Sequence, residues 1–114
     1  MFSFVKNKSI MVNPNTYFVR IVKMEFQPDK VAIFIANFEE VKDKIRSQEG
    51  NKLLELYRDK KNTNVFFTYS YWEKETDLEN YRNSVLFKNV WAKTKPLFNA
   101  KPLAWSLDKM IICS

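Results

Sequence analysis

Apolar residues recur at three- and four-residue steps between residues 31 and 45, which places them on one face of a helix. The positions in this stripe are Val31, Phe34, Ile35, Phe38, Val41 and Ile45. Pro28 or Asp29 suits the start of such a helix, and the basic residues near its end match the negative pole of the helix dipole. Gly50 is the only glycine in the chain and follows at the place of a left-handed C-terminal cap. The pattern therefore predicts one amphipathic helix that ends before Gly50.

Four segments rich in β-branched and aromatic residues predict strands. They span residues 17–26, 52–58, 65–72 and 103–112. A polar stretch between the second and third strands predicts a hairpin. A second helical region follows the third strand, where Thr76-Asp77-Leu78-Glu79 matches a capping box and Asn83-Ser84 predicts a break. The order β-α-β-β-α-β predicts a ferredoxin-like α+β fold with an antiparallel sheet.

The third predicted strand, VFFTYSYW, is apolar on both of its faces. Val65, Phe67, Tyr69 and Tyr71 alternate with Phe66, Thr68, Ser70 and Trp72. Helices cover only one face of such a sheet, and a sheet with one hydrated face should alternate cleanly between apolar and polar residues. No spare element of the chain covers the second face, so a second subunit is the simplest cover. We therefore expect a homodimer in which two sheets pack face to face and form a barrel.

Length, charge and cysteine content limit the class of protein. At 114 residues the chain has the length of one domain, and its net charge of +6 comes from basic and acidic residues mixed along most of the sequence. Cys113 is the only cysteine, so an internal disulfide is excluded. The chain has no run of 18 apolar residues, so no membrane span is predicted. We expect a cytoplasmic protein without a membrane partner. Residues 1–16 are predicted to form a flexible N-terminal extension, and residues 17–114 the folded domain.

The residue types exclude several kinds of catalytic site. The chain has 3 tryptophans, 5 tyrosines and 10 phenylalanines but no histidine. One glycine cannot build a glycine-rich phosphate loop, no Cys/His set can hold zinc, and a nucleophile triad would lack its histidine base. We therefore expect neither a metal nor another cofactor.

The run FFTYSYWEKETDLENYRNSVLFKNVWAKTKPLF and the ending KPLAWSLDKM, taken with the order of elements, resemble the antibiotic biosynthesis monooxygenase family. The likeness covers about residues 17 to 110, and the ending is similar to small members described as quinol monooxygenases. The resemblance implies a dimeric α+β barrel with a pocket between the helices and the sheet of each subunit. It also implies that some relatives oxidise aromatic polyketides or quinols without metal or flavin.

Other members of that family bind and degrade haem. These members carry a tryptophan and, ten residues later, a histidine that ligates the iron. The corresponding places in this chain hold Tyr81 and Trp91. The sequence departs from the haem-degrading pattern at both positions, so haem degradation is not expected.

Cofactor-free oxygenation requires a dry aromatic slot, a group that handles a phenolic proton, and a donor that stabilises developing negative charge. The candidates for catalytic groups are Tyr81 and Arg20. The candidates for substrate binding are Phe38, Phe67, Tyr69, Phe87 and Trp91. Tyr71, Asn80, Asn83 and Arg82 are further groups of suitable chemistry.

Each candidate also has a structural interpretation. The aromatic residues of the third strand are typical of a core, and Tyr81 and Trp91 lie on helix faces that would pack inward in any case. Arg20 lies between apolar residues and is either an edge charge or half of a buried pair with Glu25 or Glu55. With no histidine, the chain offers no ready base at neutral pH, so a substrate would have to ionise unaided or rely on a perturbed tyrosine or a carboxylate.

Three functional interpretations remain open. The first is a cofactor-independent monooxygenase that acts on a quinol or another aromatic substrate in a pocket between helices and sheet. The second is a non-catalytic dimeric module of the same fold that binds a small molecule. The third is RNA binding, because RNA recognition motifs share this topology and display aromatic residues on the sheet. The glycine-containing aromatic signature of those motifs is missing from the third strand, so we expect a small aromatic ligand and no nucleic acid.

Overall fold

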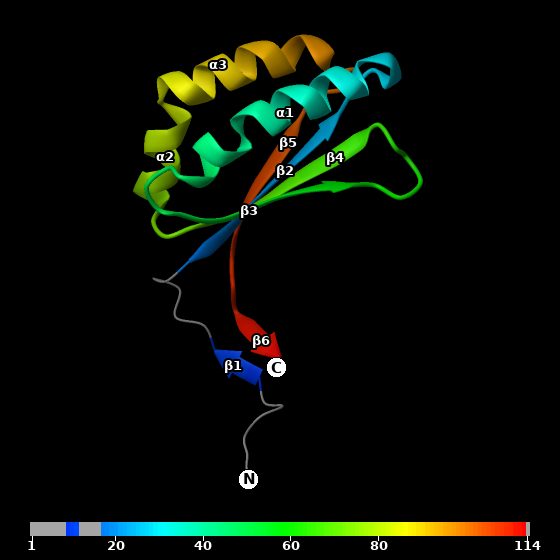
Figure 1. Ribbon diagram of the computed structural model, residues 1–114. Helices are drawn as coiled ribbons and strands as arrows, with labels where there is room; N and C mark the ends of the chain where they lie inside the picture. The colour runs from blue at the N-terminus through cyan, green and yellow to red at the C-terminus, as the bar shows by residue number, and fades with distance from the viewer. Residues whose placement is uncertain (1–8, 12–16, 114) are drawn as a thin grey trace.

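The computed structural model describes residues 9–11 and 17–113 of the chain. A four-stranded antiparallel sheet has the order β3-β4-β2-β5. Its strands are β2 (Phe18–Glu25), β3 (Asn51–Arg58), β4 (Val65–Trp72) and β5 (Leu103–Asp108). Three helices, α1 (Val31–Arg46), α2 (Glu75–Arg82) and α3 (Val85–Thr94), form a layer over one face of the sheet, as Figure 1 shows. The predicted ferredoxin-like β-α-β-β-α-β fold is confirmed.

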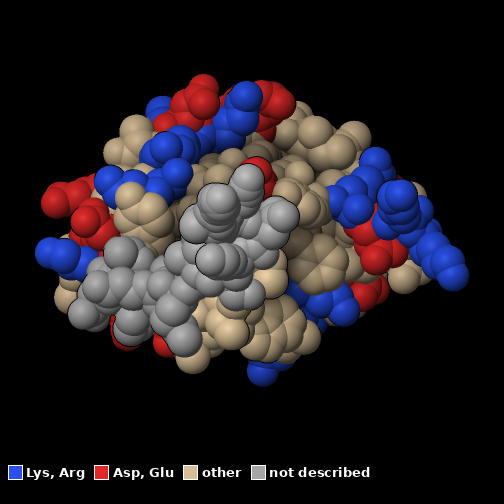
Figure 2. Space-filling model, turned by 90° about the horizontal axis from the view of Figure 1, so that it is seen from below, with Lys and Arg blue, Asp and Glu red and all other residues tan. Residues whose placement is uncertain are grey.

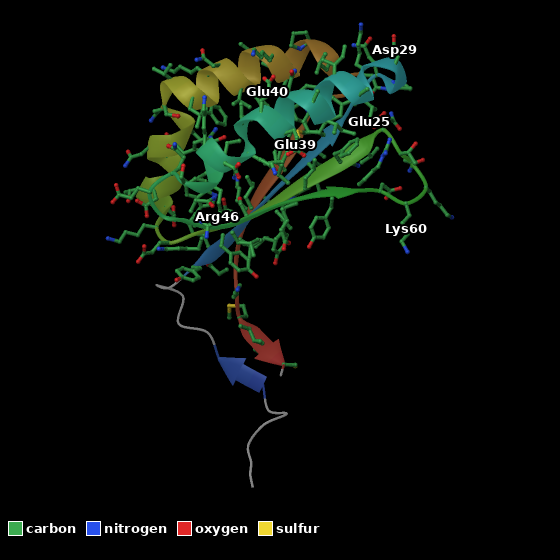
Figure 3. All side chains as sticks on the ribbon, in the orientation of Figure 1. Glu25, Asp29, Glu39, Glu40, Arg46 and Lys60 are labelled. Carbon is green, nitrogen blue, oxygen red and sulfur yellow. The ribbon has the colours of Figure 1, made fainter. Side chains whose placement is uncertain are left out.

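The first helix follows the predicted pattern closely. A 3-10 turn at Pro28–Lys30 precedes α1, and the buried residues of the helix belong to the predicted apolar stripe. At the other end, the guanidinium of Arg46 donates a hydrogen bond of 2.9 Å to the carbonyl of Asn51, which ties the end of α1 to the start of β3 (Figure 3). Gly50 has φ +83°, in the left-handed region, but the C-cap of α1 is Ser47, so the prediction that Gly50 caps the helix is wrong. No helix in the described part of the chain is long and apolar enough to cross a bilayer.

The second helical region is interrupted where the sequence predicted, but its start is different. α2 begins at Glu75, with Lys74 before it and no side-chain cap, so the predicted capping box at Thr76 is wrong. The acidic side chains of Glu75 and Asp77 lie in the first turn, where their negative charge interacts favourably with the positive pole of the helix dipole and stabilises the helix. The break ends at Ser84, which is the N-cap of α3. Its hydroxyl accepts a hydrogen bond of 3.1 Å from the Phe87 amide.

Two hydrophobic cores lie between the helices and the sheet. The larger one gathers around Phe26, which is fully buried and stacks on Phe34 with ring centroids 4.1 Å apart. The smaller one joins Phe18, Trp72 and Leu78, with Tyr81 packed against it. A cavity remains between the helices and the sheet, and residues of both cores line it.

The other face of the sheet has no covering element among the described residues. Residues from all four strands form rows across it, as the strand register shows: Glu55, Tyr69, Ile21 and Trp105 make one row, and Leu53, Tyr71, Val19 and Leu107 make the next. Trp105 is 43% exposed and Leu107 45% exposed. Seen from below, the Lys, Arg, Asp and Glu residues that are visible gather mostly toward the periphery of the molecule (Figure 2). The prediction that strand 65–72 presents apolar residues on both faces is confirmed.

The chain end departs from the predicted last strand. The segment expected over 103–112 divides into β5, which ends at Asp108, and β6 (Ile111–Cys113). β6 pairs antiparallel with β1 (Ser9–Met11) in a separate two-stranded sheet that lies below the domain in Figure 1. Of the N-terminal extension expected over 1–16, all but Ser9–Met11 lies outside the described residues.

Candidate functional site

A cavity of about 280 Å³ lies between the helical layer and the sheet. Its floor is formed by the helix-facing side chains of the sheet, among them Val22 on β2, Thr68 and Ser70 on β4, and Ala104 on β5. Its roof comes from all three helices. Ala104 is exposed, so the cavity meets the surface beside the edge strand β5. The volume is slightly below the usual range for small-molecule sites, which suits a ligand of one or two rings.

One wall of the cavity is a continuous series of aromatic contacts. Trp72 stacks on Tyr81 with centroids 5.4 Å apart, and Tyr81 meets Phe87 edge to face at 5.1 Å. Phe87 then stacks on Trp91 at 5.8 Å. Phe38 on α1 lines the cavity as well. Flat aromatic surfaces of this kind bury a planar ligand well and exclude water from it.

Arg20 places a positive charge on the floor of the cavity. It belongs to β2 and faces the helices, like its cross-strand neighbours Ser70 and Ser106. Its guanidinium donates one hydrogen bond of 3.0 Å to the hydroxyl of Ser106. The predicted alternative of a buried pair with Glu25 or Glu55 is wrong, because Arg20 forms no ion pair among the described residues.

A second guanidinium, that of Arg82 at the end of α2, also lines the cavity. It lies 3.6 Å from Glu79 in an exposed i,i+3 pair, which constrains it only weakly. Burial lowers the pKa of the Arg20 guanidinium, and the positive charge of Arg82 lowers it further. The two guanidiniums are therefore close enough to repel one another electrostatically. No Asp, Glu or Lys belongs to the described residues that line the cavity. The site is therefore apolar with two positive charges and no opposing acid.

Tyr81 brings a hydroxyl to the aromatic wall. It is half-buried as a residue, and burial raises the pKa of its phenol to about 12. No hydrogen bond of this hydroxyl occurs within the described part of the chain. At neutral pH Tyr81 is therefore a protonated donor with no partner of its own, and it cannot act as a general base.

The structure brings together five of the seven residues predicted for the site. Arg20, Phe38, Tyr81, Phe87 and Trp91 all line the cavity. Phe67 and Tyr69 do not, because their cross-strand partners Lys23 and Ile21 place them on the open face of the sheet.

Sequence reasoning missed Trp72, Thr68 and Ser70 as cavity residues. The two-residue period of the strand separated Phe67 and Tyr69 from these three, but it did not decide which set faces the helices. The indole of Trp72 donates a hydrogen bond of 3.0 Å to the hydroxyl of Ser70, which fixes the ring against the cavity. The sequence signal that could have identified the face of β4 at the cavity is the pair of polar residues, Thr68 and Ser70, on the same face as Trp72.

The donor set bears on what else the site could hold. No group of three His, Cys, Asp or Glu side chains with metal-binding geometry occurs in the described residues. The polar side-chain groups among the described lining residues are hydroxyls, indole N–H groups and guanidiniums, which bind oxygen-bearing organic ligands through hydrogen bonds.

The model of one protein family, antibiotic biosynthesis monooxygenase, matches residues 17–93. This match covers more than half of the chain and includes the floor strands β2 and β4, the helices α1 and α2, and all of α3 but its last residue. The chain belongs to the antibiotic biosynthesis monooxygenase family. A comparison with curated proteins finds no match.

Solved structures with the same fold include several members of this family. A protein from Caulobacter crescentus, described as a candidate antibiotic biosynthesis monooxygenase, is 20% identical with a TM-score of 0.79, over 85% of this chain and 92% of the other. One from Nitrosomonas europaea with the same description is 11% identical with a TM-score of 0.80, over 87% and 95%. A conserved protein from Methanosarcina mazei is 17% identical with a TM-score of 0.79, over 84% and 95%. At these identities the likeness establishes the fold alone. It gives no information about the substrate of this chain.

Proposed function

We propose that this protein is a cofactor-independent monooxygenase that oxidises a quinol or another hydroxylated aromatic compound in the cavity between helices and sheet. The observation that carries the proposal is the aromatic cavity itself, which combines ring surfaces with an unpartnered tyrosine hydroxyl and two guanidiniums. Membership of the family supports the reaction class. The size of the cavity supports a ligand of one or two rings.

The reaction uses the substrate as its own reductant. The ionised ring transfers an electron to O₂, the two radicals combine at an unsubstituted ring carbon to form a peroxide anion, and this anion takes a proton from solvent to give a hydroperoxide. The O–O bond then breaks as the hydrogen of that carbon is lost. One oxygen atom remains as a new ring carbonyl, and the other leaves as water with the ring hydrogen and the hydroxyl hydrogen. The ring supplies the four electrons that O₂ accepts, so no external reductant is needed.

The protein contributes position and charge stabilisation. Trp72, Phe87 and Trp91 hold the ring and exclude water. Tyr81 donates a hydrogen bond to the oxygen that gains negative charge, because its raised pKa keeps it protonated. No carboxylate lines the described cavity, so the substrate ionises unaided and its proton passes to solvent.

Oxygen uptake tests this function directly. Hydroquinone, naphthohydroquinone and naphthol are supplied in an oxygen electrode, and their spontaneous oxidation is subtracted. We expect uptake with at least one of them, and loss of that uptake in Thr68→Phe, which fills the cavity from its floor. Val85→Phe adds the same ring at a residue that is 74% exposed and serves as the matched control. Uptake that survives in Thr68→Phe would place the reaction outside the cavity.

A second candidate function is a non-catalytic module that binds a small aromatic molecule. The observation that favours it is the lack of any base that titrates near neutral pH among the described lining residues. Saturable binding of the same compounds by calorimetry, with no oxygen uptake from any of them, would assign this second function instead.

The functional unit in this proposal is a homodimer that covers the open face of the sheet. Several large apolar residues, Tyr57, Trp105 and Leu107 among them, are exposed on this one face, and such a group supports a role as an interface. Trp105→Glu places a charge on that face, on the edge strand β5, and should shift the mass measured by light scattering from a dimer to a monomer. Val85→Glu changes an exposed helix residue and should leave the dimer intact. A wild-type mass near 14 kDa at micromolar concentration would contradict the dimer.

A further inference from the structure

The charges at the cavity wall restrict the kind of ligand that it can hold. Arg20 and Arg82 are the charged side chains among the described lining residues, and Tyr81 is the remaining titratable one. All three present hydrogen-bond donors, and the two guanidiniums add positive charge. An anionic ligand would offer an opposite charge to these donors, whereas a neutral or cationic ligand would leave both guanidiniums without an anionic partner inside the cavity.

The hydrogen bonding of the two guanidiniums leaves most of their capacity free. A guanidinium has five N–H donors. Arg20 uses one of them within the described residues, on the hydroxyl of Ser106. Arg82 lies 3.6 Å from Glu79, beyond the distance of a strong charged hydrogen bond, and this pair is exposed. Both groups can therefore turn donors toward a ligand without breaking a buried interaction.

We propose that the cavity binds its ligand as an anion, a planar aromatic molecule whose negatively charged oxygen lies between Arg20 and Arg82. This inference rests on the proposed function in taking the cavity as the site, and it deepens that function by naming the charge state of the substrate. A carboxylate and a phenolate share the required chemistry, because each offers an anionic oxygen to guanidinium donors. For the oxidation, the same pair holds the ionised form of a phenol, which is the form that gives an electron to O₂.

Isothermal titration calorimetry with naphthoate and with its uncharged amide tests the carboxylate arm. The two probes have nearly the same shape and differ in charge. We expect naphthoate to bind roughly tenfold or more tightly than the amide, since a charged hydrogen bond to a guanidinium is worth about that much. Arg20→Met and Arg82→Met should each remove most of this preference, while Lys88→Met, at an exposed residue of α3 outside the cavity, should keep it. Equal affinity for naphthoate and the amide in the wild-type protein would overturn the inference.

Absorbance titration of para-nitrophenol tests the phenolate arm. Its ionised form absorbs visible light, so the pKa of the bound probe can be read from a titration at saturating protein. We expect the pKa of the probe to fall on binding and to return toward its free value in Arg20→Met. A pKa that stays unchanged or rises on binding would contradict an anionic ligand. Thermal unfolding of both arginine variants separates loss of binding from loss of fold.

The outcome is separable from the proposed oxidation. A strong preference for anions with no oxygen uptake would keep the anionic site and reject the monooxygenase. Oxygen uptake from a quinol with no preference for anions would keep the enzyme and reject the anionic site.

Discussion

Replacing Tyr81 with phenylalanine separates its chemical role from its structural one. The Tyr81 ring packs on Trp72 and Phe87, and phenylalanine preserves both contacts. Its hydroxyl has no hydrogen-bond partner among the described residues, so removing it costs no such bond. We expect the free energy of unfolding near neutral pH to change by less than about 1 kcal/mol, in either direction.

The same substitution has a larger effect in alkali. An unfolded tyrosine ionises near pH 10, whereas burial raises the pKa of folded Tyr81 to about 12. The folded state therefore keeps its proton longer, and its stability is full below about pH 10 and falls as the pH rises toward about 12. A difference of about two pKa units corresponds to about 2 to 3 kcal/mol lost over that window.

Urea unfolding at a series of pH values, followed by circular dichroism, measures this difference. Lysines and the other tyrosines titrate in both proteins, so the wild type minus Tyr81→Phe isolates Tyr81. We expect the wild type to lose about 2 to 3 kcal/mol more than the variant between about pH 10 and pH 12. Parallel curves would refute a buried Tyr81 phenol. Equal oxygen uptake by the two proteins at neutral pH would remove Tyr81 from the proposed reaction.

Three further predictions concern the scaffold of the site, each read by chemical unfolding. Gly50→Ala should lower the free energy of unfolding by about 1 to 2 kcal/mol or more, because φ is +83° and an added Cβ would collide with Asp77. Asp77→Gly in the same chain should recover part of this loss. An unchanged free energy of unfolding in Gly50→Ala would contradict the close approach. Phe26→Ala should cost about 3 to 5 kcal/mol because the ring is fully buried, and a cost below about 1 kcal/mol would contradict its packing. Asn51→Leu should leave stability unchanged or raise it by about 1 kcal/mol, because the buried amide has no hydrogen-bond partner among the described residues; a large loss would show that the amide is bonded.

The regular elements of this chain were predictable because their patterns are local. The three- and four-residue spacing of Phe34, Phe38 and Ile45 fixed the buried face of α1, and Ser84 marked the break between α2 and α3. The cap of α2 was not predictable from the capping-box pattern, because the helix begins at Glu75, before the threonine. Boundaries depend on the geometry of the preceding strand end, which the pattern does not contain.

The site was predictable in part. Helical residues such as Phe87 and Trp91 had to face inward because of their spacing, so they lie at the cavity. Phe67 and Tyr69 were assigned to the wrong side, because a strand that is apolar on both faces carries no signal for which face meets the helices. The last strand divides at Asp108, which pairs with Phe18 at the start of β2, and β6 pairs instead with β1, nearly the full length of the chain away. Long-range pairing of this kind has no signature in the local sequence.

The most direct test of the central claim is the fate of labelled oxygen. The quinol that supports the fastest oxygen uptake is oxidised under O₂ enriched in oxygen-18, and the product is analysed by mass spectrometry while hydrogen peroxide is assayed in parallel. A monooxygenase working in this cavity incorporates one labelled atom into each quinone and releases no hydrogen peroxide. An unlabelled quinone formed with an equal amount of hydrogen peroxide would contradict oxygen insertion.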